Sequence, residues 1–184
     1  MTPLRPEWLT ARPIAHRGLH DRGAGIIENS ASAARAAVSR GFAIECDVQM
    51  AADGEAMVFH DERLDRLTSH RGRVDALDAA TLKAIELKDG SGDTILPLPD
   101  FLALIAGRVP LVIEIKSEFT GDMRLAERTA RLAADYVGPV ALKSFDPGIM
   151  ARLRARRGPL GLAGIPLGMV AEAHYDHAEW AFLN

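Results

Sequence analysis

Two acidic residues, Glu45 and Asp47, stand at alternate positions in the segment Phe42–Met50. Strict alternation of apolar and polar residues is typical of a strand with one buried face, so both carboxylates point to the same side. Along a strand they lie about 6.6 Å apart. Two like charges this close are unfavourable in an interior unless a cation lies between them, and hard oxygen ligands favour Mg²⁺ or Ca²⁺. The pattern predicts a divalent-cation site or, alternatively, charges on a half-exposed strand.

A second segment, Leu111–Lys116, repeats this alternation. Its apolar residues share one face, while Glu114 and Lys116 share the other. Glu114 is therefore a candidate third metal ligand. The Lys116 ammonium is a candidate contact for a phosphate group or, alternatively, a structural ion-pair partner of the carboxylates.

A predicted hairpin supplies a histidine. Asp53-Gly54 is a strong signal for a two-residue turn, and Glu55–His60 is the expected return strand. In that register His60 faces Asp47, where an imidazole can exchange a proton near neutral pH. A slip by one residue would move His60 to the opposite face.

A further candidate pair follows the first predicted strand, Pro13–Arg17, which ends in His16, Arg17 and Gly18. Alternation alone would place His16 and Arg17 on opposite faces, but Gly18 lets the backbone turn, so we allow both side chains to reach the site. The alternatives are a structural histidine and an arginine that pairs with the carboxylates.

Strands and helices that alternate must position these groups. Helical segments are expected between the strands, the first capped by Asn29 or Ser30 and running to Arg40, with Gly41 at its end. This pattern predicts parallel strand–helix–strand units, whose ligands bind at the carboxyl ends of the strands. A (β/α)₈ barrel typically needs about 250 residues, so length alone would favour a smaller open α/β sheet.

The ordered motifs resemble the glycerophosphodiester phosphodiesterase family over residues 13–170. In chain order they are His16-Arg17-Gly18, Glu28-Asn29, Glu45-Cys46-Asp47, His60-Asp61, Glu114-Ile115-Lys116 and Ser144-Phe145-Asp146. The resemblance implies a single domain over residues 1–184, which is a TIM (β/α)₈-type barrel with an insertion after strand 2 at residues 61–97. It also implies that about five barrel strands are present and that the C-terminal third of the barrel is absent.

The same resemblance implies hydrolysis of glycerophosphodiesters to glycerol 3-phosphate and an alcohol. It implies one divalent cation, Mg²⁺ or Ca²⁺, held by Glu45, Asp47 and Glu114. His16 and His60 would be the general acid and base, and Arg17 and Lys116 would bind the substrate phosphate. Glu28-Asn29 either takes part directly in catalysis or only opens the following helix. The rival functions are a lysophospholipase D-like phosphodiesterase of the same superfamily and a non-catalytic barrel fragment that binds metal or a partner.

The overall composition and charge exclude several other classes of protein. The formal net charge of −3 gives no support to nucleic-acid binding, so the expected partner is a small-molecule phosphodiester. The single cysteine, Cys46, excludes an intrachain disulfide and a cysteine zinc cluster, and it is expected in the core. No signal peptide or stable membrane insertion is expected, so the default location is cytoplasmic. The oligomeric state stays open, and a weaker hypothesis places a second metal site at His174, Asp176 and His177.

Overall fold

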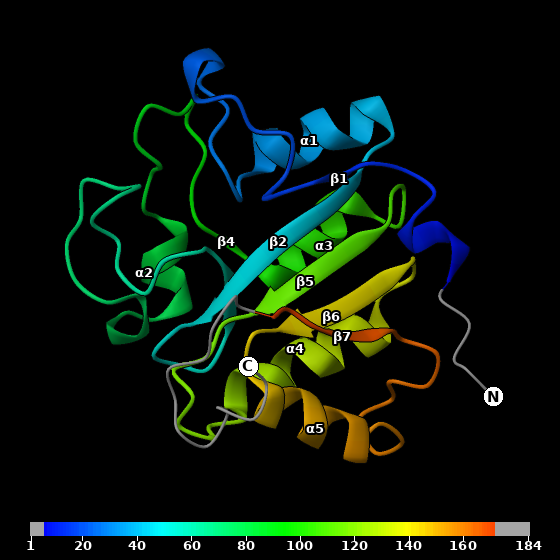
Figure 1. The fold of residues 1–184 in the computed structure, drawn as a ribbon. Coiled ribbons are helices and arrows are strands. Elements are labelled where there is room, and N and C mark those ends of the chain that lie inside the picture. Colours follow the sequence, from blue (N-terminus) through cyan, green and yellow to red (C-terminus); the bar gives the residue numbers. More distant parts are fainter. Residues whose placement is uncertain (1–5, 172–184) are drawn as a thin grey trace.

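The computed structural model describes residues 6–171, in which seven strands form one sheet (Figure 1). The strands lie in the order β4-β3-β2-β5-β6-β7, and β1 pairs with β2. Their bounds are β1 Ile14–Ala15, β2 Ala43–Met50, β3 Ala56–Val58, β4 Leu96–Pro97, β5 Leu111–Ile115, β6 Val140–Ser144 and β7 Leu167–Met169.

Five of these strands run parallel to one another: β1, β2, β5, β6 and β7. Each pairs with the next in chain order, which is the arrangement of a (β/α) barrel and not of a doubly wound sheet. The expectation of five barrel strands is thus confirmed. Within residues 6–171 the sheet stays open, with β4 and β7 as the ends of its main path.

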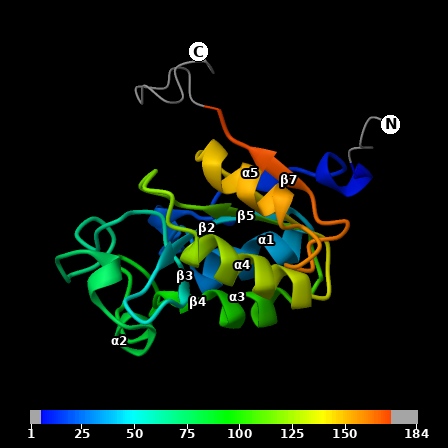
Figure 2. The same cartoon turned by 90° about the horizontal axis from the view of Figure 1, so that it is seen from below.

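Four helices connect the parallel strands: α1 Ala31–Arg40, α3 Leu98–Ile105, α4 Arg124–Asp135 and α5 Pro147–Ala155. Figure 2 shows α1, α3 and α4 layered against one side of the sheet. Local signals set their ends: Ser30 caps α1, Gly41 closes it at φ 65°, and Asp146 accepts hydrogen bonds from the first amides of α5.

The main hydrophobic core fills the space between these helices and the sheet. It takes the alternate residues Ile44, Cys46 and Val48 from β2, together with Ile113 and Ile115 from β5. Cys46 is fully buried there, as predicted. Because successive side chains point to opposite faces, the intervening polar residues of β2 and β5 face the other side of the sheet.

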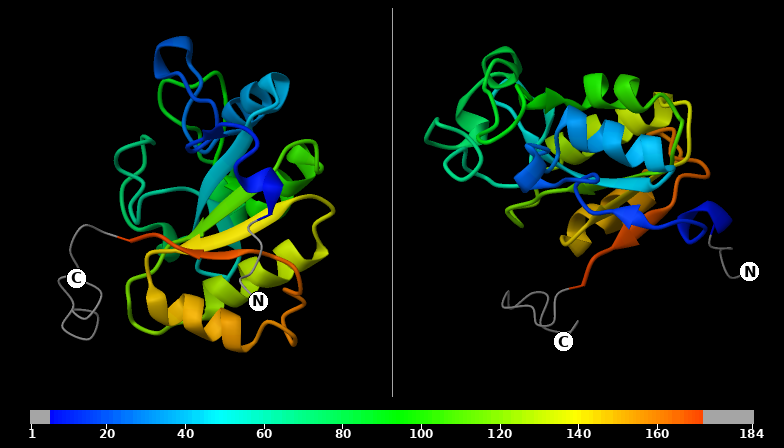
Figure 3. Two further views of the ribbon diagram at one scale, coloured as in Figure 1. Left: turned by 45° about the vertical axis from the view of Figure 1, so that its right-hand side comes forward. Right: turned by 90° about the horizontal axis from the view of Figure 1, so that it is seen from above.

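The segment after β3 forms a second, smaller core. It contains helix α2 Ala79–Lys83 and a short 3₁₀ helix, Val74–Ala76, and it lies at one side of the sheet (Figures 1 and 3). Strand β3 serves both cores, because Ala56 and Val58 belong to the main one and Met57 to the smaller one.

Two further 3₁₀ helices, Glu7–Leu9 and Arg22–Ala24, complete the elements of the described chain. No helix among residues 6–171 combines the length and apolar character needed to cross a bilayer.

Candidate functional site

Three carboxylates meet on the polar face of β2 and β5. Asp47 and Glu114 are paired in register across the two parallel strands, and Glu45 lies two residues before Asp47. One oxygen from each of Glu45, Asp47 and Glu114 lies within 4.8 Å of the others, and each residue is at most 5% exposed. The prediction that these acids converge on one buried face is confirmed.

Two lysines form ion pairs with this acidic cluster. Lys116 Nζ lies 2.8 Å from Asp47 Oδ1 and donates to Glu114. Lys143 Nζ lies 3.0 Å from Glu45 Oε1 and 2.7 Å from Glu114 Oε2. Both side chains are about four-fifths buried, so these ion pairs are only weakly screened by solvent.

The sequence-based reasoning missed Lys143, although its signal was present. Alternation along β6 places Lys143 on the same face as Ala141, and the register of β5 and β6 sets it beside Glu114. Burial alone would lower the pKa of Lys143, but the ion pairs with Glu114 and Glu45 outweigh burial and raise its pKa. The ammonium is therefore charged at neutral pH.

A turn after β1 brings His16 and Arg17 to the cluster. Arg17 and Gly18 both adopt left-handed backbone conformations, with φ of 58° and 79°. The Arg17 amide donates to Glu45 Oε2 at 3.0 Å, and His16 Nε2 lies 4.0 Å from the same oxygen. The His16 side chain is 67% exposed, so it stands at the open side of the carboxylates. The turn thus overrides the alternation that would have separated the two residues.

The Arg17 guanidinium makes ion pairs inside the site. Its Nη1 donates to Glu28 Oε1 at 2.8 Å, and its Nε lies 3.4 Å from Asp47 Oδ2 without forming a hydrogen bond. The structural ion-pair role that we kept as an alternative for Arg17 is therefore present. The same holds for Lys116, through Asp47 and Glu114.

Glu28 and Asn29 do not cap the following helix, since that role belongs to Ser30. Asn29 instead holds Asp47: its Nδ2 donates to Asp47 Oδ2 at 2.9 Å, and its Oδ1 accepts the Asp47 amide at 3.2 Å. Asn29 is 2% exposed and has φ of 55°, a left-handed conformation that asparagine tolerates. Asn29 therefore fixes the position of the Asp47 carboxylate.

Glu28 connects the site to the insertion. It accepts hydrogen bonds from Arg17 and from Arg66, and Arg66 also donates to Asp61. Burial would raise the pKa of Glu28, but the hydrogen bonds from Arg66 and Arg17 outweigh it and lower the pKa to about 2. Asp61 is likewise shifted: burial opposes ionisation, yet the bonds from Arg66 and His60 lower its pKa. Both acids are ionised at neutral pH.

The predicted pairing of His60 with Asp47 is wrong. The hairpin loop has three residues, because the Ala51 amide bonds to the Glu55 carbonyl and Gln49 pairs with Met57. This register is one residue away from the expected one. Phe59 accordingly takes the position opposite Asp47, to whose carbonyl it donates its amide.

His60 nevertheless remains at the site, because the strand ends at Val58 and the chain then bends. Its carbonyl accepts from Gln49 Nε2 at 3.0 Å, and its ring Nδ1 lies 2.7 Å from Asp61 Oδ1. The side chain is 30% exposed and lines a cavity together with Gln49 and Lys116.

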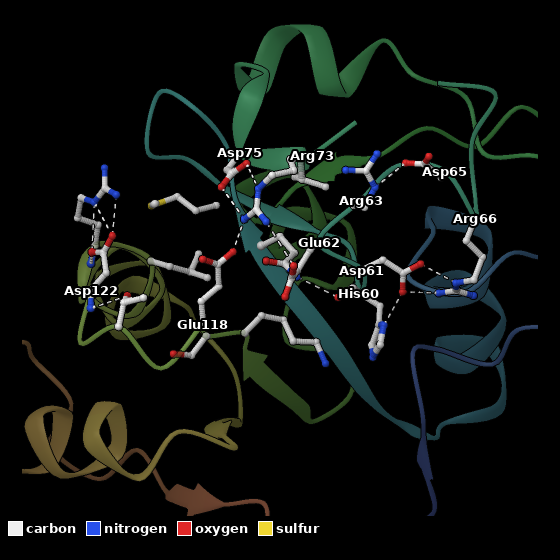
Figure 4. A pocket seen from close by; sticks show the side chains of 18 residues that line it. His60, Asp61, Glu62, Arg63, Asp65, Arg66, Arg73, Asp75, Glu118 and Asp122 are labelled. Atoms are coloured by element: carbon white, nitrogen blue, oxygen red, sulfur yellow. Dashed lines mark hydrogen bonds and ion pairs between the residues drawn. The ribbon is translucent and has the colours of Figure 1, made fainter. Parts of the chain in front are cut away.

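This cavity has a volume of about 640 Å³ and is bordered by the insertion and the loop after β5. Figure 4 shows charged side chains from both segments around it, with His60 next to Asp61 and Arg66. Arg73 of the insertion forms ion pairs with Asp75, Glu62 and Glu118, the last of which follows β5. Lys116 joins this cavity to the carboxylate cluster.

One predicted site cannot be placed. The second metal site considered at His174, Asp176 and His177 lies outside the described residues.

Comparisons with known proteins agree with this geometry. The model of the glycerophosphoryl diester phosphodiesterase family matches residues 16–181. A glycerophosphodiester phosphodiesterase from Caldanaerobacter subterraneus subsp. tengcongensis is 33% identical over 130 residues, which are 67% of this chain. The match covers 52% of that enzyme, so the chain spans about half of its length.

Solved structures share the fold. A phosphodiesterase from Oleispira antarctica, solved in complex with the product sn-glycerol-3-phosphate, has a TM-score of 0.73 at 22% identity, covering 92% of this chain and 68% of that one. A glycerophosphodiester phosphodiesterase from Agrobacterium tumefaciens has a TM-score of 0.65 at 26% identity, covering 80% and 64%. These barrel structures confirm the TIM-type fold. Since the family model spans most of the sequence, the chain belongs to the glycerophosphoryl diester phosphodiesterase family.

Proposed function

We propose that this protein hydrolyses glycerophosphodiesters to glycerol 3-phosphate and an alcohol. The observation that carries the proposal is the buried cluster of Glu45, Asp47 and Glu114, with His16 at 4.0 Å from Glu45 and a cavity lined by His60 beside it. A glycerol phosphodiester of the deacylated phospholipid type, such as glycerophosphocholine or glycerophosphoethanolamine, is the proposed substrate.

The carboxylates fit a divalent cation of the hard type. All three offer oxygen atoms, which Mg²⁺ and Ca²⁺ prefer. Glu45 Oε1 is buried without a hydrogen bond of normal geometry, and the partner it has is a cation, the Lys143 ammonium at 3.0 Å. When bound, the ion would supply Lewis-acid stabilisation of the charge that develops on the phosphoryl oxygens.

His16 and His60 would transfer the protons of the reaction. If neutral His60 donates from Nδ1 to Asp61, its lone pair lies on Nε2, where it can accept a proton from the attacking hydroxyl. His16 would then protonate the leaving oxygen. In the reaction that we propose, the glycerol hydroxyl of the substrate attacks phosphorus to give a cyclic phosphate, which water opens with the two roles exchanged.

Two positively charged side chains, Lys116 and Arg17, would bind the substrate phosphate. Lys116 stands between the carboxylates and the cavity, so its ammonium can contact a phosphoryl oxygen while it keeps an ion pair with Asp47. Arg17 offers its Nε, which makes no hydrogen bond within the described chain.

The test is the release of glycerol 3-phosphate from glycerophosphocholine with Mg²⁺ or Ca²⁺. We expect EDTA to abolish release, and His16→Ala and His60→Ala each to reduce it by about a hundredfold or more. His70→Ala, an exposed histidine of the insertion outside the cavity lining, is the matched control and should keep full activity.

Other outcomes distinguish the rival functions. Release of choline from lysophosphatidylcholine, without turnover of glycerophosphocholine, would favour the lysophospholipase D-like activity. A folded protein that binds the metal but hydrolyses neither substrate would support the remaining hypothesis, a non-catalytic barrel fragment that binds metal or a partner.

A further inference from the structure

Lys143 occupies an unusual position for a lysine, because its ammonium lies between two of the proposed metal ligands. Nζ is 3.0 Å from Glu45 Oε1 and 2.7 Å from Glu114 Oε2. These oxygens come from two neighbouring strands, and a third strand, β6, supplies the lysine. Among the lysines and arginines of residues 6–171, Lys143 alone forms a side-chain ion pair with Glu45.

A divalent ion shared by the same carboxylates would need the same space. Mg²⁺ and Ca²⁺ bind oxygen at about 2.0–2.6 Å, so an ion that bridges Glu45 and Glu114 would sit close to the observed position of the ammonium. A second positive charge at such a short distance is strongly repelled. Ammonium and metal therefore exclude each other at this point.

The Lys143 ammonium can move out of its position between the carboxylates. Lysine carries its charge on a flexible four-carbon stem, and the Lys143 side chain is 22% exposed, so the ammonium can move toward solvent while β6 stays fixed. Lys116 also contacts two of the carboxylates, Asp47 and Glu114, but it differs from Lys143 because it lines the neighbouring cavity, where it can keep a role with substrate phosphate.

The lysine also supplies positive charge to acids that are buried close together. Removing one partner from a buried ion-pair network leaves an uncompensated charge, which is strongly destabilising. Lys143 and Lys116 together provide an ion pair for every carboxylate of the cluster.

We propose that Lys143 is a built-in counter-ion that takes the cation position between Glu45 and Glu114 and must be displaced before a divalent ion binds there. The proposal rests on the metal site of the proposed function. Its consequence is a lower apparent affinity for divalent ions than the three carboxylates alone would have, because the ammonium must leave before an ion binds.

The experiment is calorimetric titration of the full chain, freed of metal, with Mn²⁺ as the probe ion. Lys143→Gln removes the charge but keeps polar atoms, and we expect it to bind Mn²⁺ about tenfold or more tightly than the wild type. Lys143→Arg keeps the charge and should stay near the wild-type affinity. Lys83→Gln, which alters a surface ion pair with Asp100, is the control for loss of a lysine elsewhere.

Thermal unfolding gives a second readout. In EDTA, Lys143→Gln should melt at a lower temperature than the wild type, and saturating Mn²⁺ should raise its melting temperature by more than that of the wild type. If Lys143→Gln does not fold without metal, refolding it in Mn²⁺ is expected to rescue it, and failure of that rescue would count against the proposal.

The outcomes separate this inference from the proposed function. Equal or weaker Mn²⁺ binding by Lys143→Gln, in a protein whose wild type binds Mn²⁺ and releases glycerol 3-phosphate, would overturn the role of Lys143 alone. If neither wild type nor variant binds Mn²⁺, both the lysine role and the metal site fail.

Discussion

Asp47 is the most firmly held side chain of the site. Asn29 binds both its carboxylate and its amide, Lys116 pairs with one oxygen, and the Arg17 guanidinium approaches the other. If Asp47 is a metal ligand, as we propose, it would need little reorganisation when an ion binds, and mutation of such supporting partners typically costs about 10–100-fold in metal affinity. The residues behind the carboxylates are therefore part of the functional unit.

Glu28 makes the pH dependence of this unit testable. Its pKa is lowered from 4.5 to about 2 in the folded protein, so its ion pairs stabilise the fold fully above about pH 4.5 and lose that effect as the pH falls toward 2. The shift corresponds to at most about 3 kcal/mol. We expect Glu28→Gln to remove this part of the acid sensitivity, as measured by urea unfolding from pH 6 to pH 2.

Glu7→Gln, at an exposed acid, is the control and should leave the pH profile unchanged. An unaltered profile in Glu28→Gln would show that the pairs with Arg17 and Arg66 do not contribute to stability.

At the scale of elements, the turn after β1 is the most constrained connection of the site. The Gly18 amide lies within bonding distance of the carbonyls of Ala15 and Glu45, which ties the turn to β2. A Cβ at Gly18 would come within 2.8 Å of Ala33 Cβ in helix α1, at a φ of 79°. The close approach of this turn to α1 is what points His16 and Arg17 toward the carboxylates.

Gly18→Ala should therefore displace the turn as well as destabilise the fold. Backbone strain and the clash together are expected to cost about 2–4 kcal/mol. Gly54→Ala is the matched control, because φ is 86° there but no atom lies within 4 Å, so only the conformational cost of about 1 kcal/mol applies. Denaturant unfolding measures both, and equal losses would contradict the role of the contact with Ala33.

Local patterns predicted much of this arrangement. Alternation in β2 and β5 was sufficient to place Glu45, Asp47 and Glu114 on one face, because a strand with one apolar side has a fixed period of two. The hairpin register failed since Asp53-Gly54 is compatible with a loop of either two or three residues, and the sequence does not distinguish them. Lys143 was overlooked because its partner Glu114 becomes its neighbour only when strands pair.

At the scale of the whole molecule, two cores share one sheet. The main core lies under the helices, and the insertion builds its own around Leu82, with Met57 and Phe59 of the hairpin contributing to it. Arg66 and Arg73 then connect the insertion to the site through Glu28 and Glu118. The insertion thus forms one wall of the cavity, yet its packing is largely separate.

This separation predicts local unfolding. Leu82→Ala leaves a void in the insertion core, and such changes cost about 2–5 kcal/mol. We expect hydrogen exchange to accelerate in residues 61–95 while β5 keeps its protection. Ile105→Ala, an equally buried site in the main core, should instead weaken protection across the sheet. Loss of protection in β5 after Leu82→Ala would show that the two cores unfold as one.

Anomalous diffraction from crystals grown with Mn²⁺ would show whether the three carboxylates of the two adjacent strands hold one divalent ion. We expect one strong peak at about 2.0–2.6 Å from an oxygen of each of Glu45, Asp47 and Glu114. The electron-density map of the same crystal should show the Lys143 ammonium moved away from Glu45. A peak elsewhere, or none at millimolar Mn²⁺ with the carboxylates still bound to the two lysines, would contradict the proposed metal site.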